Sequence, residues 1–156
     1  MKPLAENLSG PTVVDRRGLV LDSNVVLDWL LFEDVRVRPI VQAIETGAVH
    51  WLVNSAVRHE LEVVMARGEL GRWAHRQPML WQAWARWACE QPLPAVSLIV
   101  SRLRCTDVED QKFLDLAVDQ QAVWLVTRDR AVLKLSRKAA LLGLQIMTPS
   151  QWTCSI

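Results

Sequence analysis

A short apolar run that ends in an aspartate is the feature that most restricts the fold of this chain. The run Leu19-Val20-Leu21 is followed directly by Asp22, Ser23 and Asn24. An unbroken apolar run of this length is typical of a strand that helices cover on both faces. Because ligands of parallel sheets collect at the carboxyl ends of the strands, Asp22 is a candidate site residue. The alternative is that Asp22 or Ser23 caps the helix that we expect over 25–31.

The order of strand and then helix recurs along the chain. We expect a helix over Arg38–Thr46, a strand over Val49–Val53 and a third helix over Ala56–Arg67. Another buried strand is expected over Val123–Thr127, and a short one over Val96–Val100. This alternation predicts an α/β fold, in which helices form two layers around a central, mainly parallel sheet.

The length of 156 residues and a hydrophobic content of 51% suit one packed domain. We expect residues 1–17 to be a mobile lead-in and residues 18–156 to form the domain, since Pro and Gly interrupt the polar start of the chain. No apolar run approaches the roughly 20 residues that cross a bilayer, and the first residues lack the apolar centre of a signal peptide. We therefore expect a cytoplasmic location without membrane association.

Glu60 is an acid on the apolar face of the third expected helix. It lies at helical spacing with Val63 and Val64. A carboxylate against the core is costly unless a group pairs with it. Glu60 is therefore a candidate site residue, and a salt bridge to Arg58 or Arg67 is the alternative.

A second group of acids opens a later helix, after residue 106. Asp110 shares a helical face with Phe113 and Leu114, so we expect it to face the sheet at the start of that helix. Asp115 falls on another face. Asp107 and Asp110, three residues apart, also fit a capping arrangement, which is the alternative for both acids. For Asp107 we prefer that interpretation.

The expected helix Pro78–Gln91 carries Trp81, Trp84 and Trp87 at intervals of three residues. Tryptophan at helical spacing most often packs in a core, and a self-association surface is a related possibility. Stacking on bases is the less favoured alternative. We therefore expect this helix to be buried in the domain or in a homo-oligomer.

The strand expected over Val123–Thr127 is followed by a second strand-end acid, Asp129. Asp22, Asp110 and Asp129 each lie at a strand end or helix start, so these acids and Glu60 are expected to converge at one edge of the sheet. Carboxylates that lie close together repel and raise one another's pKa. Binding of a hard divalent cation such as Mg²⁺ or Mn²⁺ usually offsets this repulsion.

In their order and spacing, four segments resemble the PIN-domain nucleases: Leu21-Asp22-Ser23-Asn24-Val25, Glu60-Leu61, Asp107-Val108-Glu109-Asp110 with Phe113-Leu114 and Ala117, and Leu125-Val126-Thr127-Arg128-Asp129. The similarity covers about Gly18–Trp152 and is greatest to the toxin components of toxin–antitoxin pairs. It implies an acidic metal site with polar neighbours. The acids are Asp22, Glu60, Asp110 and Asp129, of which all but Glu60 hold the metal, and the neighbours are Asn24 and Thr127.

The chain departs from this family pattern at two positions. Val108 stands where this branch often has Pro, and Arg128 where Gly is frequent. Neither departure removes an acid. Arg128 would either crowd the site or contact phosphate.

The resemblance implies metal-dependent hydrolysis of phosphodiester bonds in single-stranded RNA, with a small antitoxin protein as partner. Bound metal lowers the pKa of a water molecule and stabilises the charge on the leaving oxygen, so no side-chain nucleophile is needed. The residues agree, because no Ser or Cys stands beside a convincing base and the three His residues lack zinc spacing. A phosphatase with a nucleophilic aspartate would need a second aspartate where this chain has Asn24. The alternative function is a non-catalytic RNA-binding or scaffold module with the same fold.

Basic residues follow the last acid of the candidate site. The net charge of +1 gives no general attraction to nucleic acid, so RNA binding requires a local basic surface. We expect one final helix that begins next to Asp129 and carries Arg130, Lys134 and Arg137 as a basic stripe. These three residues and Arg128 are expected to contact phosphates. A solvated helix face is the ordinary alternative for such a stripe.

Overall fold

The computed structural model describes residues 17–68, 70–95 and 103–152. In this part of the chain, five parallel strands form one sheet in the order β3-β2-β1-β4-β5. The strands are β1 (Gly18–Leu21), β2 (His50–Val53), β3 (Ala88–Glu90), β4 (Trp124–Val126) and β5 (Gln145–Met147). The parallel pairing of all five strands confirms the predicted α/β class.

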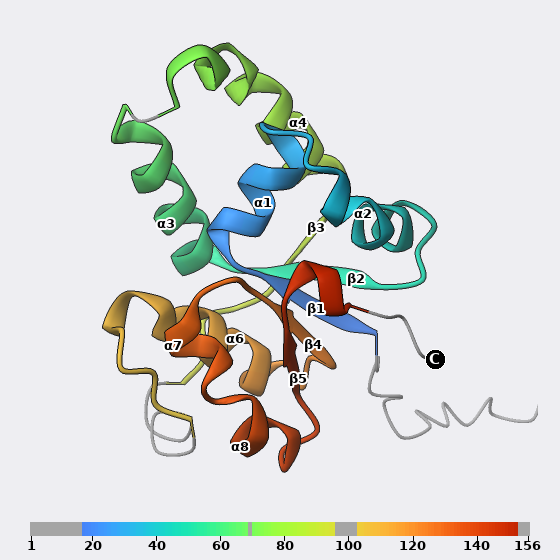
Figure 1. Cartoon of the computed structure of the whole chain (residues 1–156), viewed down its shortest axis with the longest axis vertical. Helices are drawn as coiled ribbons and strands as arrows, with labels where there is room; N and C mark the ends of the chain where they lie inside the picture. The colour runs from blue at the N-terminus through green and yellow to red at the C-terminus, as the bar shows by residue number, and fades with distance from the viewer. Residues whose placement is uncertain (1–16, 69, 96–102, 153–156) are drawn as a thin grey trace, which may run out of the picture.

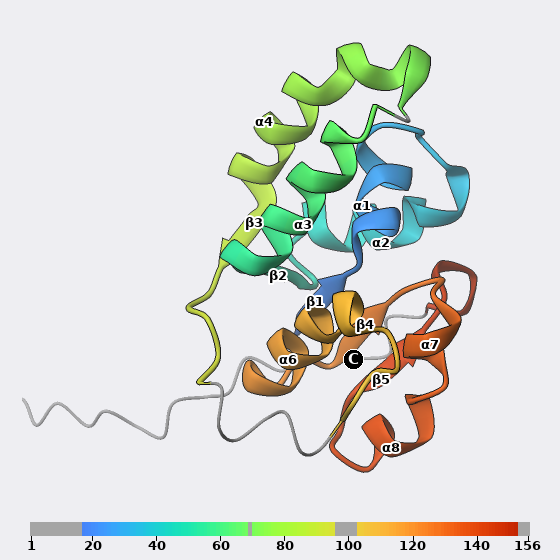
Figure 2. The same cartoon turned by 90° about the vertical axis from the view of Figure 1, so that its left-hand side faces the viewer.

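Helices cover both faces of this sheet, as Figures 1 and 2 show. One layer holds α1 (Ser23–Leu30), α2 (Arg38–Glu45), α3 (Ser55–Ala66) and α4 (Gln77–Trp87). The other layer holds α6 (Gln111–Asp119), α7 (Arg130–Leu133) and α8 (Ser136–Ala140). The 3₁₀ turns are Val35–Val37, Gly71–Arg76, Val108–Asp110 and Pro149–Gln151. No helix of the described residues is long and apolar enough to cross a membrane.

The strand order explains why the helices separate into these two layers. From β1 the chain moves outward to β2 and β3, then returns across the sheet to β4 beside β1 and continues outward to β5. Crossovers between parallel strands are right-handed, so reversing the direction of travel places the later helices on the opposite face. The reversal lies between β1 and β4. In such sheets, ligands bind beyond the carboxyl ends of the strands at this switch point.

The central position of β1 accounts for its apolar sequence. Leu19 pairs with Trp51 of β2 on one side and with Trp124 of β4 on the other. All four residues of β1 are buried. A strand enclosed by neighbours and by helices on both faces has no position for a solvated side chain until it ends. The first polar side chain after β1 is Asp22, at the switch point.

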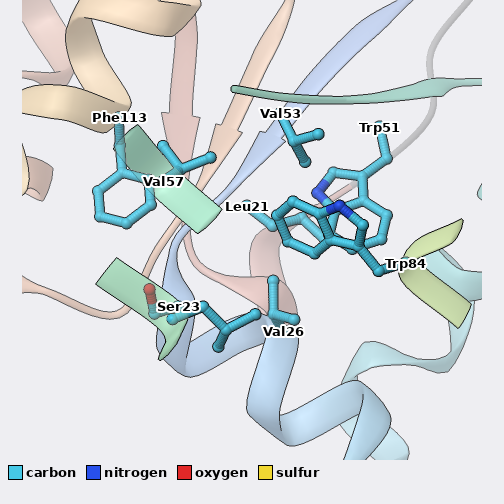
Figure 3. A pocket seen from close by; sticks show the side chains of 9 residues that line it. Leu21, Ser23, Val26, Trp51, Val53, Val57, Trp84 and Phe113 are labelled. Carbon is cyan, nitrogen blue, oxygen red and sulfur yellow. The ribbon is translucent and has the colours of Figure 1, made fainter. Parts of the chain in front are cut away.

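The tryptophan-rich helix packs into the core and ends earlier than the sequence predicts. Helix α4 stops at Trp87, and the following residues form the edge strand β3 beside β2. Trp84 is buried and its ring centroid lies 5.0 Å from that of Trp51, which in turn lies 5.2 Å from that of Trp29. Figure 3 shows Trp51 and Trp84 together at one end of a cavity of about 10 Å³ under α1. Core packing therefore accounts for Trp84, while a homo-oligomer through Trp81, Trp84 and Trp87 stays a prediction.

Two further differences from the predicted elements lie within residues 130–147. The basic segment expected as one final helix forms the two short helices α7 and α8, separated by Lys134 and Leu135. The strand β5 was not predicted, because its three-residue run includes the exposed Gln145. The strand predicted over Val96–Val100 lies outside the described residues, as do residues 1–16 of the predicted lead-in.

Candidate metal centre

Asp22 lies at the carboxyl end of β1 and is buried at 5% exposure. Its Oδ1 accepts a hydrogen bond from the Val25 N–H at 2.9 Å, so Asp22 is the N-cap of α1. Its Oδ2 accepts a hydrogen bond from the Thr127 hydroxyl. The capping interpretation is therefore correct as geometry. It leaves the site interpretation open, because the same carboxylate faces the end of β4.

Thr127 joins the ends of β1 and β4. While its hydroxyl donates to Asp22, the same oxygen accepts the Asp129 N–H at 3.0 Å. Thr127 is fully buried. A hydroxyl with one donor and two acceptor sites can make both bonds at once. Thr127 therefore fixes the backbone of Asp129 relative to the carboxylate of Asp22.

A cluster of three carboxylates lies at this edge of the sheet, formed by Asp107, Asp110 and Asp129. One oxygen of each lies within 4.8 Å of the others. Asp107 caps the 3₁₀ turn Val108–Asp110 by accepting the Glu109 N–H at 3.0 Å, and Asp129 caps α7 by accepting the Ala131 N–H at 2.8 Å. Asp110 makes no capping bond with its side chain. Caps of separate elements thus converge because those elements all begin at the switch point.

The electrostatics of the cluster single out Asp110. Burial, a hydrogen bond with the Asp129 carboxyl, and the charges of Asp129, Asp107 and Asp22 raise the pKa of Asp110 from 3.8 to about 7. The effect of the Asp22 charge shows that Asp22 belongs to the same electrostatic environment. Burial also raises the pKa of Asp22, against lowering by the Thr127 hydroxyl, the Val25 N–H and Arg128. Both carboxyls are therefore stabilised in the protonated form while no cation is present.

These residues fit a hard divalent cation. The Oδ2 atom of Asp110 is buried and has no hydrogen-bond partner among the described residues. A buried carboxylate oxygen without a partner is costly, and a cation would satisfy it. The nearby donors from Asp107, Asp129 and Asp22 are all carboxylate oxygens, which Mg²⁺ and Mn²⁺ prefer. The donor set contains no sulfur or imidazole ligand.

Glu60, the fourth predicted acid, makes an ion pair on the side of α3 that faces α6. Its Oε2 lies 2.8 Å from the Lys112 Nζ, and the two side chains are 16% and 25% exposed. The sequence suggested Arg58 or Arg67 as the partner of Glu60. Arg58 instead pairs with Glu62 at 3.1 Å. Thus Glu60 is neutralised by a residue of the helix that begins after Asp110. The carboxylate that joins Asp110 and Asp129 within 4.8 Å is Asp107, for which the sequence favoured only a capping role.

Arg128 forms an ion pair with Asp28 of α1. Asp28 is 5% exposed, and burial raises its pKa while Arg128 lowers it. Asp28 was not among the predicted site residues. A signal was present, because an acid within the apolar helical run from Val25 to Leu31 requires a partner.

The remaining predicted residues lie around this centre. Asn24 is exposed in the first turn of α1, and the structure records no contact between its side chain and the carboxylates. Arg130, Lys134 and Arg137 are exposed on α7, at its end and on α8. Their exposure is compatible with phosphate contacts and equally with a solvated face.

A family model for the PIN domain matches residues 18–131 of the sequence. The chain belongs to the PIN-domain family. The match spans β1, β4 and all the acids described above, so this PIN domain carries its carboxylate cluster within the matched region. No curated protein sequence matches the chain significantly.

Among solved structures, the PIN domain is similar to the crystal structure of VapBC2 from Rickettsia felis bound to a DNA fragment from their promoter. The superposition has a TM-score of 0.59 at 13% sequence identity and covers 84% of this chain and 98% of the other. At this identity the likeness concerns the fold. It agrees with the α/β architecture described above.

Proposed function

We propose that this PIN domain is a Mg²⁺- or Mn²⁺-dependent endoribonuclease that hydrolyses phosphodiester bonds of single-stranded RNA. The observation that carries the proposal is the carboxylate cluster at the switch point, in which Asp110 has a buried oxygen without a partner and a pKa raised to about 7. Asp22, Asp110 and Asp129 would hold the metal, with Asp107 as a further carboxylate beside them. Bound metal would supply a water of lowered pKa and neutralise charge on the phosphate.

The protein residues would prepare this centre in three ways. Thr127 holds Asp22 and the backbone of Asp129 in one arrangement through its hydroxyl. Asp110 would have to lose its proton to hold a cation, so binding of metal would be coupled to pH. Glu60 is proposed as a site acid that acts from its ion pair with Lys112.

The substrate would be held by the basic residues of the α7–α8 region. Arg130, Lys134 and Arg137 are exposed and follow Asp129 in the chain. Phosphate contacts of this kind position a strand without reading its sequence. The net charge of +1 makes such a local surface necessary.

The test is cleavage of a labelled single-stranded RNA in Mn²⁺, with an EDTA control. Asp22→Asn, Asp110→Asn and Asp129→Asn should each lower the rate at least about 100-fold, because each removes a charged ligand. Asp115→Asn and Glu62→Gln should stay within about twofold, since both acids lie outside the cluster. Full activity in all three ligand variants would refute the nuclease mechanism. Tight RNA binding without metal-dependent cleavage would favour the non-catalytic alternative.

We further propose that the chain is the toxin of a toxin–antitoxin pair and acts in the cytoplasm. The fold-level likeness to VapBC2 supports this assignment, and a small antitoxin protein would be the partner. Expression of the chain should arrest growth, and the Asp129→Asn variant should not. Co-expression of a small protein encoded next to the chain should restore growth. Equal growth arrest by the parent and by Asp129→Asn would contradict a toxicity that depends on cleavage.

A further inference from the structure

A pocket of about 220 Å³ lies beyond the carboxyl ends of β4 and β5, where Arg128 and Pro149 line it. Its charged lining residues form two ion pairs, Asp28 with Arg128 and Asp34 with Arg36. Arg128 connects the pocket to the cluster, because it stands between Thr127 and Asp129 in the chain and its charge lowers the pKa of Asp22. The pocket is therefore next to the proposed cleavage site.

The charges of this pocket are balanced. Arg36 is bound to Asp34 through its Nε at 3.0 Å and its Nη2 at 2.5 Å, and this pair lowers the pKa of Asp34 to about 2. Arg128 is bound to the buried Asp28. Two guanidiniums beside two carboxylates give almost no net attraction for a bare phosphate. A guanidinium carries five N–H groups, so each arginine keeps donors that a neutral ligand can use.

The remaining lining residues are partly apolar and partly polar. Val37 and Pro149 contribute the apolar part, and Thr148 and Ser150 also line the pocket. The side chains of Arg36 and Arg128 are 56% and 38% exposed, so their guanidiniums are accessible to a ligand. An apolar surface with adjacent planar donors is the combination that binds an unpaired nucleobase. A volume of about 220 Å³ accommodates a single base.

We propose that this pocket binds one unpaired guanine of the RNA strand, next to the scissile phosphate. This inference rests on the proposed cleavage of RNA and names the base that the site selects. Guanine presents O6 and N7 as neighbouring acceptors, which match the paired N–H donors of a guanidinium. Adenine places an amino donor beside N7, and the pyrimidines lack this edge. Arg36 and Arg128 would supply the donors, and Asp34 and Asp28 would hold the guanidiniums in position.

The experiment is digestion of a randomised single-stranded RNA pool in Mn²⁺, followed by sequencing of the cut ends. The parent should enrich guanine about tenfold at one position beside the cut, as expected for one good bidentate contact. Arg36→Ala should reduce this enrichment to twofold or less. Arg36→Lys should do the same although it keeps the charge, because lysine lacks the planar pair of donors. Arg38→Ala, a neighbouring arginine outside the pocket, should keep the enrichment.

Base-independent cutting, enrichment of another base, or guanine enrichment unchanged in Arg36→Ala would overturn the proposal. A binding measurement separates this failure from failure of the nuclease mechanism. In EDTA, fluorescein-labelled UUGUU should bind the Asp129→Asn variant about tenfold more tightly than UUAUU, and Arg36→Ala in that background should remove the difference. Equal affinities would refute the pocket whether or not the parent cleaves RNA.

Discussion

Replacing Asp110 with Asn should stabilise the metal-free protein at alkaline pH. In the fold, Asp110 lies among carboxylates that raise its pKa to about 7, whereas the ordinary value is 3.8. The folded state therefore binds the Asp110 proton more tightly than the unfolded chain does. The stability from this proton is complete below about pH 4 and is lost as the pH rises through about 7. Asn keeps the shape of the side chain and carries no ionisable proton.

The structure sets the size of this effect. A separation of roughly three pH units between 3.8 and about 7 corresponds to about 4 kcal/mol in full. Asp110 is only partly buried, so solvent screening reduces this to about 2 kcal/mol. About half of this pH-dependent loss of folding stability falls between pH 5 and pH 8. The parent should therefore lose about 1 kcal/mol more stability than Asp110→Asn over this range, or about 3 °C in melting temperature.

The assay is urea unfolding in EDTA at pH 5 and pH 8, with Asp119→Asn as the control. Asp119 is an exposed acid at the other end of α6, and its replacement should leave the difference between the two pH values unchanged. Mn²⁺ at pH 8 should then raise the melting temperature of the parent more than that of Asp110→Asn, because the variant has lost a ligand. Parallel pH profiles for the parent and Asp110→Asn would refute the reasoning, as would an identical response of both proteins to Mn²⁺.

Three other changes test the structure. Thr127→Val should lower the free energy of unfolding in urea by about 2 kcal/mol, because it leaves the Asp22 carboxylate and the Asp129 N–H without their buried partner. Thr127→Ser should lower it less, and equal losses would contradict a role for the hydroxyl. Trp84→Ala should cost about 3–5 kcal/mol by opening a cavity under α1, and a loss below about 1 kcal/mol would show that the indole is not part of the core. Charge reversal at Lys134 or Arg137 should weaken binding of unrelated RNA sequences equally and flatten the salt dependence in anisotropy titrations; an unchanged salt slope would indicate a solvated face.

Much of the fold could be predicted from the sequence because its signals are local. The apolar run before Asp22 identifies a strand enclosed on both sides, and the alternation of strands and helices identifies a parallel sheet. The predicted helix Arg38–Thr46 differs from α2 by one residue, since Pro39 and Gly47 mark its ends. Short edge strands carry no such signal. Both β3 and β5 contain partly exposed residues and depend on pairing with a neighbouring strand.

The sequence also indicated which acids lie near the switch point, because strand ends and helix starts can be located from local patterns. Asp22, Asp110 and Asp129 were placed in this way, and their role as metal ligands stays a prediction. Helical periodicity placed Glu60 on the inner face of α3. It could not assign the partner of that carboxylate.

The tertiary structure decided the pairings of the charged side chains. Glu60 meets Lys112 and Asp28 meets Arg128, although each pair joins elements far apart in the chain. Asp107 lies in the carboxylate cluster while it also caps its own turn. The physical reason is that the energies of Coulomb interactions and hydrogen bonds change strongly over a few ångströms of distance. Backbone periodicity places a residue on a face of its element, but the packing of separate elements sets which opposite charge lies within that distance.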